Sequence, residues 1–223
     1  MITAIGDILN QILLTFDRVT GNYAYAIVLL TLLVRLVTWP LTNKQLASAK
    51  AVQDLQPEIK KLQEKYKNDK EKLNAETMEL WKKHKVNPAA GCLPLLIQMP
   101  ILWAMFNVLR EPPPEVQHFI LLGVNMRLSV NDLHAAGYAF SLAAVGYYFL
   151  VALSGATTYI QQKMMMTDKS QQALLIFMPI MLLYFSLQFP AGLVLYWVVN
   201  NVLSIVHHLL INRKPAKGAV TEK

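Results

Sequence analysis

The stretch YAYAIVLLTLLVRLVTWPL, residues 23–41, decides the fold of this chain. It carries no charged side chain except Arg35. A helix of about 20 mostly apolar residues matches the ~30 Å hydrocarbon core of a bilayer. We therefore expect residues 23–41 to form a transmembrane helix that holds an arginine inside the membrane.

Four more apolar runs of comparable length follow along the chain. Their ranges are 89–109, 135–160, 172–189 and 190–211. The last two are contiguous, and we separate them at Phe189-Pro190-Ala191-Gly192 because proline and glycine in this order favour a tight turn over one very long helix. Prolines inside the second run are tolerable because neighbouring helices can satisfy the freed backbone groups. The sequence thus predicts an all-α integral membrane protein with five transmembrane helices.

Composition excludes several other classes of protein. Of the 223 residues, 54% are hydrophobic and 16% are charged, and the mean hydropathy is +0.33, which is too apolar for a soluble domain of this length. The net charge is +7, but the basic residues lie between the apolar runs, so we expect no nucleic-acid specificity. The single cysteine, Cys92, excludes a disulfide framework within one chain. The sequence has no nucleotide fingerprint, HExxH spacing or GxSxG elbow, so we expect no enzyme, metal site or cofactor.

Basic residues are distributed unequally among the segments that join the expected spans. Of the 21 Lys and Arg residues, 11 lie in residues 42–88, and the loop 161–171 and the tail 212–223 hold most of the others. The positive-inside rule places these three segments in the cytoplasm. Residues 110–134 and the N-terminus then lie outside, so we expect an N-out, C-in topology.

Two segments outside the expected spans should also be helical. In residues 1–22, apolar residues recur at helical spacing, which predicts an interfacial amphipathic helix along the outer leaflet. Residues 42–88 keep a helical period on both sides of Asn68-Asp69, which predicts a cytoplasmic helical hairpin whose first arm is started or kinked by Pro57. The charge of this hairpin fits either a solvated face or an arm that contacts anionic lipid, the ribosome or translocation partners.

Arg35 is the most informative residue in the expected spans. An arginine in a transmembrane helix costs ~2.5–3.5 kcal/mol on insertion scales, so its charge needs compensation. Arg35 could snorkel, because it lies about 9 Å from the cytoplasmic end of its span. However, Thr31, Thr38 and Thr42 share its helical face, and a snorkelling arginine needs no polar stripe. The stripe therefore favours a functional arginine.

Other expected spans carry polar residues of their own. They are Gln98 in the second span and Tyr196, Asn200, Asn201, Ser204, His207 and His208 in the last. We expect these groups to converge on one hydrated cavity in the cytoplasmic half, although they could instead form interhelical hydrogen bonds worth ~0.6 kcal/mol each. We interpret His207-His208 as an interfacial polar anchor. No Asp or Glu lies in any expected span, so Arg35 can attract an external anion.

Several motifs make the chain similar to one known family. They are Thr31-x-x-x-Arg35 followed by Pro40-Leu41-Thr42, Leu55-Gln56-Pro57, Val86-Asn87-Pro88, Gly91-Cys92-Leu93-Pro94-Leu95-Leu96-Ile97-Gln98-Met99-Pro100 and Phe189-Pro190-Ala191-Gly192-Leu193-Val194-Leu195-Tyr196-Trp197. Over nearly its whole length the chain resembles the YidC/Oxa/Alb membrane protein insertases. It looks like a minimal bacterial version, without the extra N-terminal span and large periplasmic domain of Gram-negative members and without the lipidation signal of many Gram-positive members.

The resemblance implies a five-helix core with a groove that opens to the cytoplasm and to lipid and is closed on the outside. It implies that Arg35 is an essential groove arginine, that Thr31 is a groove residue one turn away, and that Tyr196 and Trp197 contact the substrate helix. The implied function is a non-enzymatic insertase in the bacterial inner membrane that acts on nascent membrane proteins. Further partners that it implies are membrane lipids, the Sec translocon, the ribosome and the signal recognition particle pathway.

Two other functions fit parts of the sequence. A small anion-selective channel or carrier could use Arg35 as its filter, and conductance in reconstituted vesicles would reveal it. A structural assembly factor that packs beside other spans would not need Arg35. Met164-Met165-Met166 could offer a soft surface to apolar segments or could simply pack at the membrane surface.

Overall fold

The computed structural model describes residues 2–84, 86, 93–110, 119–165 and 172–212. Its elements are α1 (Ile2–Thr20), α2 (Tyr23–Asp54), α3 (Gln56–Lys65), α4 (Lys70–Lys83), α5 (Leu93–Arg110), β1 (Ile120–Leu121), β2 (Val124–Asn125), α6 (Val130–Ala135), α7 (Leu142–Met165), α8 (Gln172–Gln188) and α9 (Ala191–Asn212). The prediction of a mainly helical protein is confirmed. Cys92, the triple proline at 112–114 and the basic tail beyond residue 212 lie outside the described residues.

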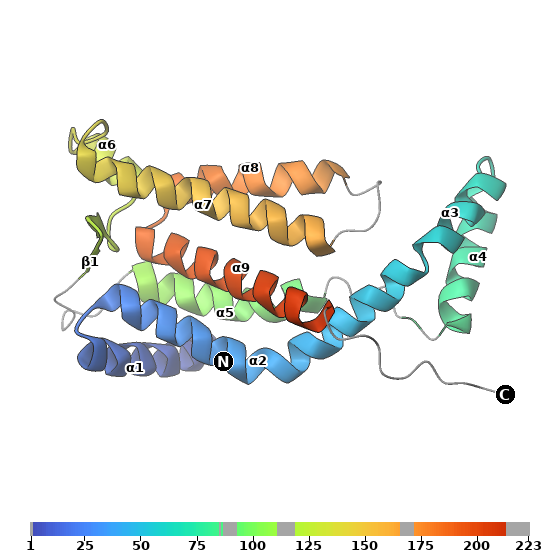
Figure 1. Ribbon diagram of the computed structural model, residues 1–223, viewed down its shortest axis with the longest axis horizontal. Coiled ribbons are helices and arrows are strands. Elements are labelled where there is room, and N and C mark those ends of the chain that lie inside the picture. The colour runs from blue at the N-terminus through green and yellow to red at the C-terminus, as the bar shows by residue number, and fades with distance from the viewer. Residues whose placement is uncertain (1, 85, 87–92, 111–118, 166–171, 213–223) are drawn as a thin grey trace.

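Helix α9 lies at the centre of the bundle, in contact with α7 on one side and with α2 and α5 on the other. Helix α8 packs beside α7, and α1 packs against α2 and α5. The α3–α4 hairpin projects from one end of the bundle, and the β1–β2 hairpin and α6 lie at the opposite end (Figure 1). We name these the α3–α4 end and the β-hairpin end. The central position of α9 gives it two faces inside the protein, which matters for the polar residues below.

Large apolar side chains occur both in the core and on the outer surface. Tyr23, Ile27 and Leu30 of α2 are fully buried, and they pack with Leu13 of α1 and Met105 of α5. Many equally large apolar residues of α7, α8 and α9 are exposed, as expected for helices that face lipid. By length and composition, Tyr23–Asp54 and Ala191–Ile211 are the two helices in the described part of the chain that could cross a membrane. The five spans and their orientation stay predictions.

Helix α2 is longer than the expected span and does not end at residue 41. It continues through Pro40 to Asp54, and Figure 1 shows it changing direction along its length, as expected of a helix with an internal proline. Residues 42–54 are rich in Ala, Lys and Gln, which favour helix, so the loss of one backbone donor at Pro40 bends the helix without ending it. The helix therefore does not end at the predicted boundary between residues 41 and 42; the point at which α2 leaves the membrane stays a prediction.

The two arms beyond α2 match the sequence interpretation. Pro57 lies at the first positions of α3, where its missing N–H is harmless. The turn falls between Lys65 and Lys70, and the side chain of Asp69 caps α4 by accepting a hydrogen bond from the Lys72 backbone N–H at 3.0 Å. The structure thus has a helical hairpin with its turn near Asn68-Asp69, formed by Gln56–Lys65 and Lys70–Lys83 within the predicted range 42–88; its cytoplasmic location stays a prediction.

The segment before α7 differs from its prediction. The expected span begins at residue 135, but α7 begins at Leu142. Ser129 and Asp132 form a capping box that starts α6, and Gly137, with φ +80°, follows its end. The expected outer loop also holds the β1–β2 hairpin. Apolar residues between 135 and 141 made this ordered segment look like part of a span.

The predicted helix at the N-terminus is present as α1, but its apolar stripe is turned inward. Leu9 and Leu13 are buried against α2 and α5, not offered to lipid. The location of α1 relative to a membrane stays a prediction. The break before Pro190 is confirmed, because α8 ends at Gln188 and α9 begins at Ala191.

Candidate functional site

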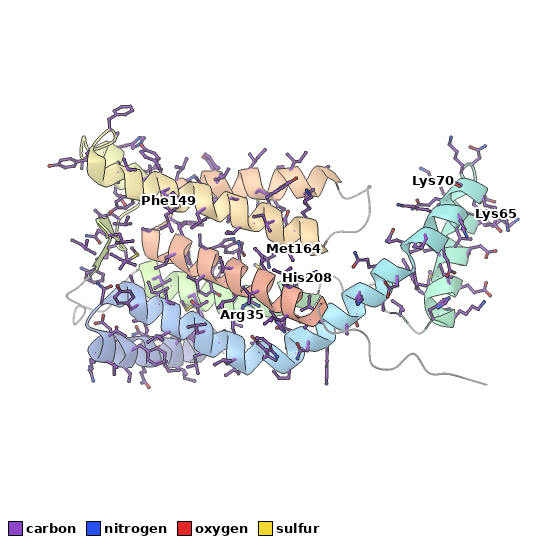
Figure 2. The ribbon with its side chains drawn as sticks, in the orientation of Figure 1. Arg35, Lys65, Lys70, Phe149, Met164 and His208 are labelled. Atoms are coloured by element: carbon purple, nitrogen blue, oxygen red, sulfur yellow. The ribbon has the colours of Figure 1, made fainter. Side chains whose placement is uncertain are left out.

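Arg35 reaches from α2 to α9 and binds two neutral groups there. Its Nη2 donates to the Asn200 backbone oxygen at 2.9 Å and to Ser204 Oγ. Ser204 Oγ also donates to the Asn200 oxygen at 2.8 Å. Figure 2 shows Arg35 at the boundary between the two helices. We call Arg35, Asn200 and Ser204 the Arg35 cluster.

The guanidinium of Arg35 is not fully satisfied. Its buried Nε has no hydrogen-bond partner among the described residues, and the bonds of its Nη2 go to a carbonyl and a hydroxyl, not to a carboxylate. A cation in a poorly hydrated place is stabilised much better by a negative partner than by neutral ones. Arg35 is therefore a partly buried cation with capacity left for an anion.

The threonines on the face of Arg35 donate their hydrogen bonds within α2. Thr31 Oγ1 donates to the Ile27 oxygen at 2.7 Å, Thr38 Oγ1 donates to the Val34 oxygen at 2.8 Å, and Thr42 Oγ1 repeats the pattern with the Thr38 oxygen at 3.0 Å. Each hydroxyl uses its only proton on a carbonyl one turn earlier in α2. The stripe therefore offers acceptor oxygens, and the available positive charge on this face belongs to Arg35.

Toward the α3–α4 end, a second contact joins α2 to α9. The rings of Trp39 and His207 stack with centroids 3.9 Å apart, and His207 Nε2 lies 2.7 Å from Asn43 Oδ1. His207 is only 3% exposed, so the interpretation of it as an interfacial anchor is wrong. Arg35, Trp39 and Asn43 are each one helical turn apart, and this spacing could have predicted the contact between α2 and α9.

Other polar residues of α9 face α7 instead. Thr158 Oγ1 accepts hydrogen bonds from Trp197 Nε1 at 3.0 Å and from Asn201 Nδ2 at 2.8 Å, and it donates to the Ser154 oxygen at 2.7 Å. Asn201 Nδ2 also lies 3.3 Å from Thr157 Oγ1. Asn201 is 2% exposed. We call Thr157, Thr158, Trp197 and Asn201 the Thr158 cluster.

The residues predicted to converge on one cavity thus form two clusters on α9, one bonded to α2 and the other bonded to α7. Arg35, Asn200 and Ser204 meet on the α2 face, whereas Trp197 and Asn201 bond to α7. The side chain of Tyr196 is buried in the apolar core. The backbone of Gln98 lies in α5, and its side chain is outside the described residues.

Sequence reasoning missed the partners that α7 supplies. Ser154, Thr157 and Thr158 lie three and four residues apart inside an expected span, which is the spacing of one polar helical face. That spacing was a readable signal.

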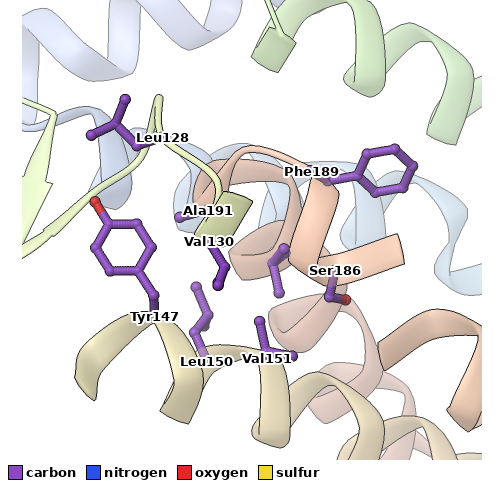
Figure 3. A pocket seen from close by; sticks show the side chains of 9 residues that line it. Leu128, Val130, Tyr147, Leu150, Val151, Ser186, Phe189 and Ala191 are labelled. Carbon is purple, nitrogen blue, oxygen red and sulfur yellow. The ribbon is translucent and has the colours of Figure 1, made fainter. Parts of the chain in front are cut away.

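The structure also contains a small apolar pocket at the β-hairpin end, away from both clusters. Its lining includes Leu128 and Val130 from the outer segment, Tyr147 and Val151 of α7, and Ala191 of α9 (Figure 3). No charged side chain lines it. The hydroxyl groups in its lining, of Tyr147 and Ser186, are already hydrogen-bonded to Asn125 and Ser154, so the Arg35 cluster is the better candidate site.

Known proteins match this chain over most of its length. A family model described as the 60Kd inner membrane protein matches residues 15–218. The chain is 42% identical to the membrane protein insertase YidC of Wolinella succinogenes, over 86% of this chain and 34% of that protein. It is 38% identical to the membrane protein insertase YidC of Fusobacterium nucleatum, over 91% of this chain and 92% of that protein.

A solved structure agrees with these relatives. The structure described as "Active YidC insertase crystal structure with the first transmembrane domain resolved" superposes with a TM-score of 0.64 at 25% identity, over 91% of this chain and 45% of that one. The chain spans about a third of the length of the Wolinella relative. Both polar clusters fall within the residues that the family model matches. The chain therefore belongs to the family of the 60Kd inner membrane protein, the bacterial inner-membrane family that includes the membrane protein insertases named YidC.

Proposed function

We propose that this chain is a membrane protein insertase that uses Arg35 to attract polar or acidic segments of nascent membrane proteins. The observation that carries the proposal is the state of Arg35, a partly buried cation whose partners among the described residues are a carbonyl and a hydroxyl. The family supports the activity, because the relatives are named insertases. The proposed activity makes and breaks no covalent bond.

In the proposed topology the chain crosses the bacterial inner membrane five times, with its N-terminus outside and its C-terminus in the cytoplasm. The spans are α2, α5, α7, α8 and α9, and the α3–α4 end lies in the cytoplasm. The Arg35 cluster then faces a groove between α2 and α9 in the cytoplasmic half. The positive-inside rule supports this orientation, because the α3–α4 hairpin is rich in lysine.

In the proposed mechanism a substrate carboxylate replaces the neutral partners of Arg35. The bonds of Arg35 to a carbonyl and a hydroxyl are already charge-assisted, and a carboxylate adds an opposite charge and can bind the guanidinium with two parallel bonds, so the exchange favours the acidic segment. Ser204 loses little, because its hydroxyl already donates to the Asn200 oxygen at 2.8 Å. Arg35 thereby lowers the desolvation cost of carrying a short polar segment part-way across the membrane.

The apolar helix of the substrate then moves into lipid. Burial of about 20 apolar residues in hydrocarbon drives this step, and the membrane potential assists the transfer of acidic residues. We propose that the basic α3–α4 hairpin receives the nascent chain at the cytoplasmic surface, where the ribosome, the signal recognition particle pathway or the Sec translocon would deliver it. No cofactor enters this scheme.

The experiment compares wild type, Arg35→Ala and Arg35→Lys in proteoliposomes. It measures protease-protected insertion of a single-span substrate with an acidic translocated segment and of a matched substrate with a neutral one. We expect Arg35→Ala to fail with the acidic substrate and Arg35→Lys to retain it, because the mechanism requires positive charge. Equal insertion of both substrates by Arg35→Ala would exclude the charge mechanism, and anion conductance by the wild type without insertion would favour a channel.

A further inference from the structure

The tip of the β1–β2 hairpin has a residue that does not suit a turn in water. The register pairs Ile120 with Asn125 and Leu121 with Val124, so Leu122-Gly123 is a two-residue turn. Both residues have positive φ, +50° and +82°. Such turns favour Asn-Gly or Gly-Gly, because a side chain with a branched apolar body is strained at positive φ. Leu122 nevertheless occupies this position and is 94% exposed.

The hairpin is held firmly, so its exposed tip has a fixed position. Asn22 Nδ2 donates to the Ile120 oxygen at 3.0 Å. The hydroxyl of Tyr147 accepts from the Asn125 N–H at 2.8 Å and donates to the Asn125 oxygen at 3.2 Å. Tyr147 thus satisfies backbone groups of β2 that a short strand would otherwise leave to water. A hairpin with satisfied edges can lie where water is scarce.

The contact with α7 fixes the level of the tip along that helix. A Cβ atom added to Gly146 would lie 2.5 Å from Val124 Cγ2 and 3.7 Å from the Leu122 oxygen. The absence of a side chain at Gly146 therefore lets the hairpin pack directly on α7. Helix α7 begins at Leu142, four residues earlier, so the tip lies about 6 Å inside the start of the helix at 1.5 Å per residue.

The exposed face of α7 beside Gly146 is apolar. Val145 is 58% exposed and Phe149 is 67% exposed, and Figure 2 shows Phe149 on the part of α7 nearer the β-hairpin end. Leu122 lies beside this part of α7, since its backbone oxygen is 3.7 Å from the position of a Cβ atom added to Gly146. Phe140, two residues before α7, is fully exposed as well, in a place where aromatic residues typically meet the membrane interface. The exposed leucine at the tip is therefore near a surface that faces lipid if α7 spans the membrane.

We propose that the β1–β2 hairpin is a lipid-binding element whose tip, Leu122, inserts into the outer leaflet at the boundary between headgroups and acyl chains. The proposal rests on the topology in the proposed function, in which α7 is a span and the β-hairpin end lies outside. Lipid is the favoured occupant because the exposed tip lies beside the part of α7 that carries Val145 and Phe149, at a depth just inside the start of that helix. The strained leucine is then explained, because transfer of its side chain from water to lipid offsets the unfavourable backbone conformation.

The test uses nitroxide labels on single cysteines in proteoliposomes, in a Cys92→Ser background. Labels replace Leu122, Phe149 as the lipid reference and Asn131, an exposed residue of α6, as the water reference. We expect the label at 122 to collide more often with oxygen than with a water-soluble nickel chelate, at a depth between the two references. A label at 122 that behaves like the one at 131, or that is shielded from both reagents by a protein contact, would overturn the proposal.

Two further results distinguish a failure of the hairpin proposal from a failure of the proposed topology. If the label at 149 also lies in water, α7 is not a span and the topology fails together with the hairpin proposal. If only 122 lies in water, the hairpin proposal alone fails and the proposed function is untouched. In a second comparison, a label at the exposed Ile120 should move toward water when Leu122 is replaced by Asn, a residue that tolerates positive φ. An unchanged depth at 120 would show that Leu122 does not hold the hairpin in lipid.

Discussion

The two polar clusters of α9, one bonded to α2 and the other to α7, differ in how completely their hydrogen bonds are satisfied. In the Thr158 cluster, the Thr158 hydroxyl donates once and accepts twice, which uses its whole capacity. In the Arg35 cluster, both bonds are donated by Nη2, and Nε has no partner in the described part of the chain. One cluster is saturated and neutral, whereas the other is unsaturated and charged.

This difference suggests different tasks for the two faces. A saturated buried network is costly to open, because each freed donor or acceptor stays unsatisfied. The Thr158 cluster therefore stabilises the packing of α9 against α7. The Arg35 cluster can exchange partners at lower cost, because a substrate carboxylate satisfies the guanidinium better than the present neutral groups do. We expect the α2–α9 face to exchange with substrate while the α7–α9 face stays closed.

The largest effect is expected when a substitution places a negatively charged side chain permanently beside Arg35. Ser204→Asp places a carboxylate where the serine hydroxyl now meets Arg35. We expect insertion of an acidic substrate to fall at least about tenfold, because hydrogen bonds to charged groups are worth ~1.5–3 kcal/mol and ~1.4 kcal/mol corresponds to a factor of ten. Initial rates of protease-protected insertion measure this, beside a substrate with a neutral segment.

The matched control for that variant is Ser204→Asn, which has nearly the same shape and no charge. It should insert the acidic substrate at close to the wild-type rate. The neutral substrate should be inserted by both variants. If Ser204→Asp and Ser204→Asn lose activity equally, the effect is one of size, and the idea that Arg35 needs a free charge is wrong.

The saturated cluster should show its importance in stability rather than in substrate choice. Thr158→Val keeps the shape of the side chain but leaves Trp197 Nε1 and Asn201 Nδ2 without their shared acceptor. We expect a loss of about 2 kcal/mol in the free energy of unfolding, since a buried donor left unsatisfied costs ~1–3 kcal/mol. Unfolding in detergent micelles, followed by circular dichroism, provides the measurement.

Thr158→Ser restores the hydroxyl and is the control for that loss. It should recover most of the stability. Insertion of acidic and neutral substrates should decline together in Thr158→Val, because the Thr158 cluster stabilises the helix contact and does not distinguish substrates by charge. If Thr158→Val lowered insertion of the acidic substrate alone, Thr158 would take part in recognising substrate charge. The two clusters would then not differ in function.

The contact between Trp39 and His207 should have a smaller effect on the protein than either cluster, measured as a change in the free energy of unfolding. His207→Phe keeps a ring to stack on Trp39 but removes the hydrogen bond to Asn43 Oδ1. We expect a loss of about 1 kcal/mol in unfolding free energy, the usual value of one net hydrogen bond. Asn43→Ala should cost a similar amount, and the double variant should cost little more than either single variant. Additive losses would mean that the two residues do not interact in the membrane.

Sequence patterns predicted the elements whose signals are local. Pro57, Asp69 and Pro190 act through their own backbone or cap geometry, so the arms of the α3–α4 hairpin and the break before α9 were readable. Pro40 misled, because a proline bends a helix without ending it when good helix formers follow. The β1–β2 hairpin was missed because its leucine tip lacks the usual Asn-Gly signal.

The candidate site was predictable in composition but not in arrangement. The helical spacing of Arg35, Asn200 and Ser204 is visible in the sequence, but which face of α9 meets which helix depends on the packing of helices far apart in the chain. Asn200 and Asn201 are neighbours in sequence, yet the backbone oxygen of Asn200 bonds to Arg35 of α2 and the side chain of Asn201 bonds to Thr158 of α7. Periodicity gives the faces of one helix, and the order of helices around it decides what each face contacts.

The smallest effect expected is at Thr38, and it is informative because the sequence placed this residue in the groove beside Arg35. Thr38 Oγ1 donates to the Val34 oxygen within its own helix, so Thr38→Val removes a bond that the helix backbone does not need. We expect unfolding free energy to change by no more than about 0.5 kcal/mol and insertion of both substrates to stay at the wild-type rate. A clear loss of insertion at unchanged stability would show that substrate donors bind the Thr38 oxygen. The groups that bind substrate would then include the threonine hydroxyls of α2. An unchanged rate would instead limit substrate binding to Arg35 and its partners on α9.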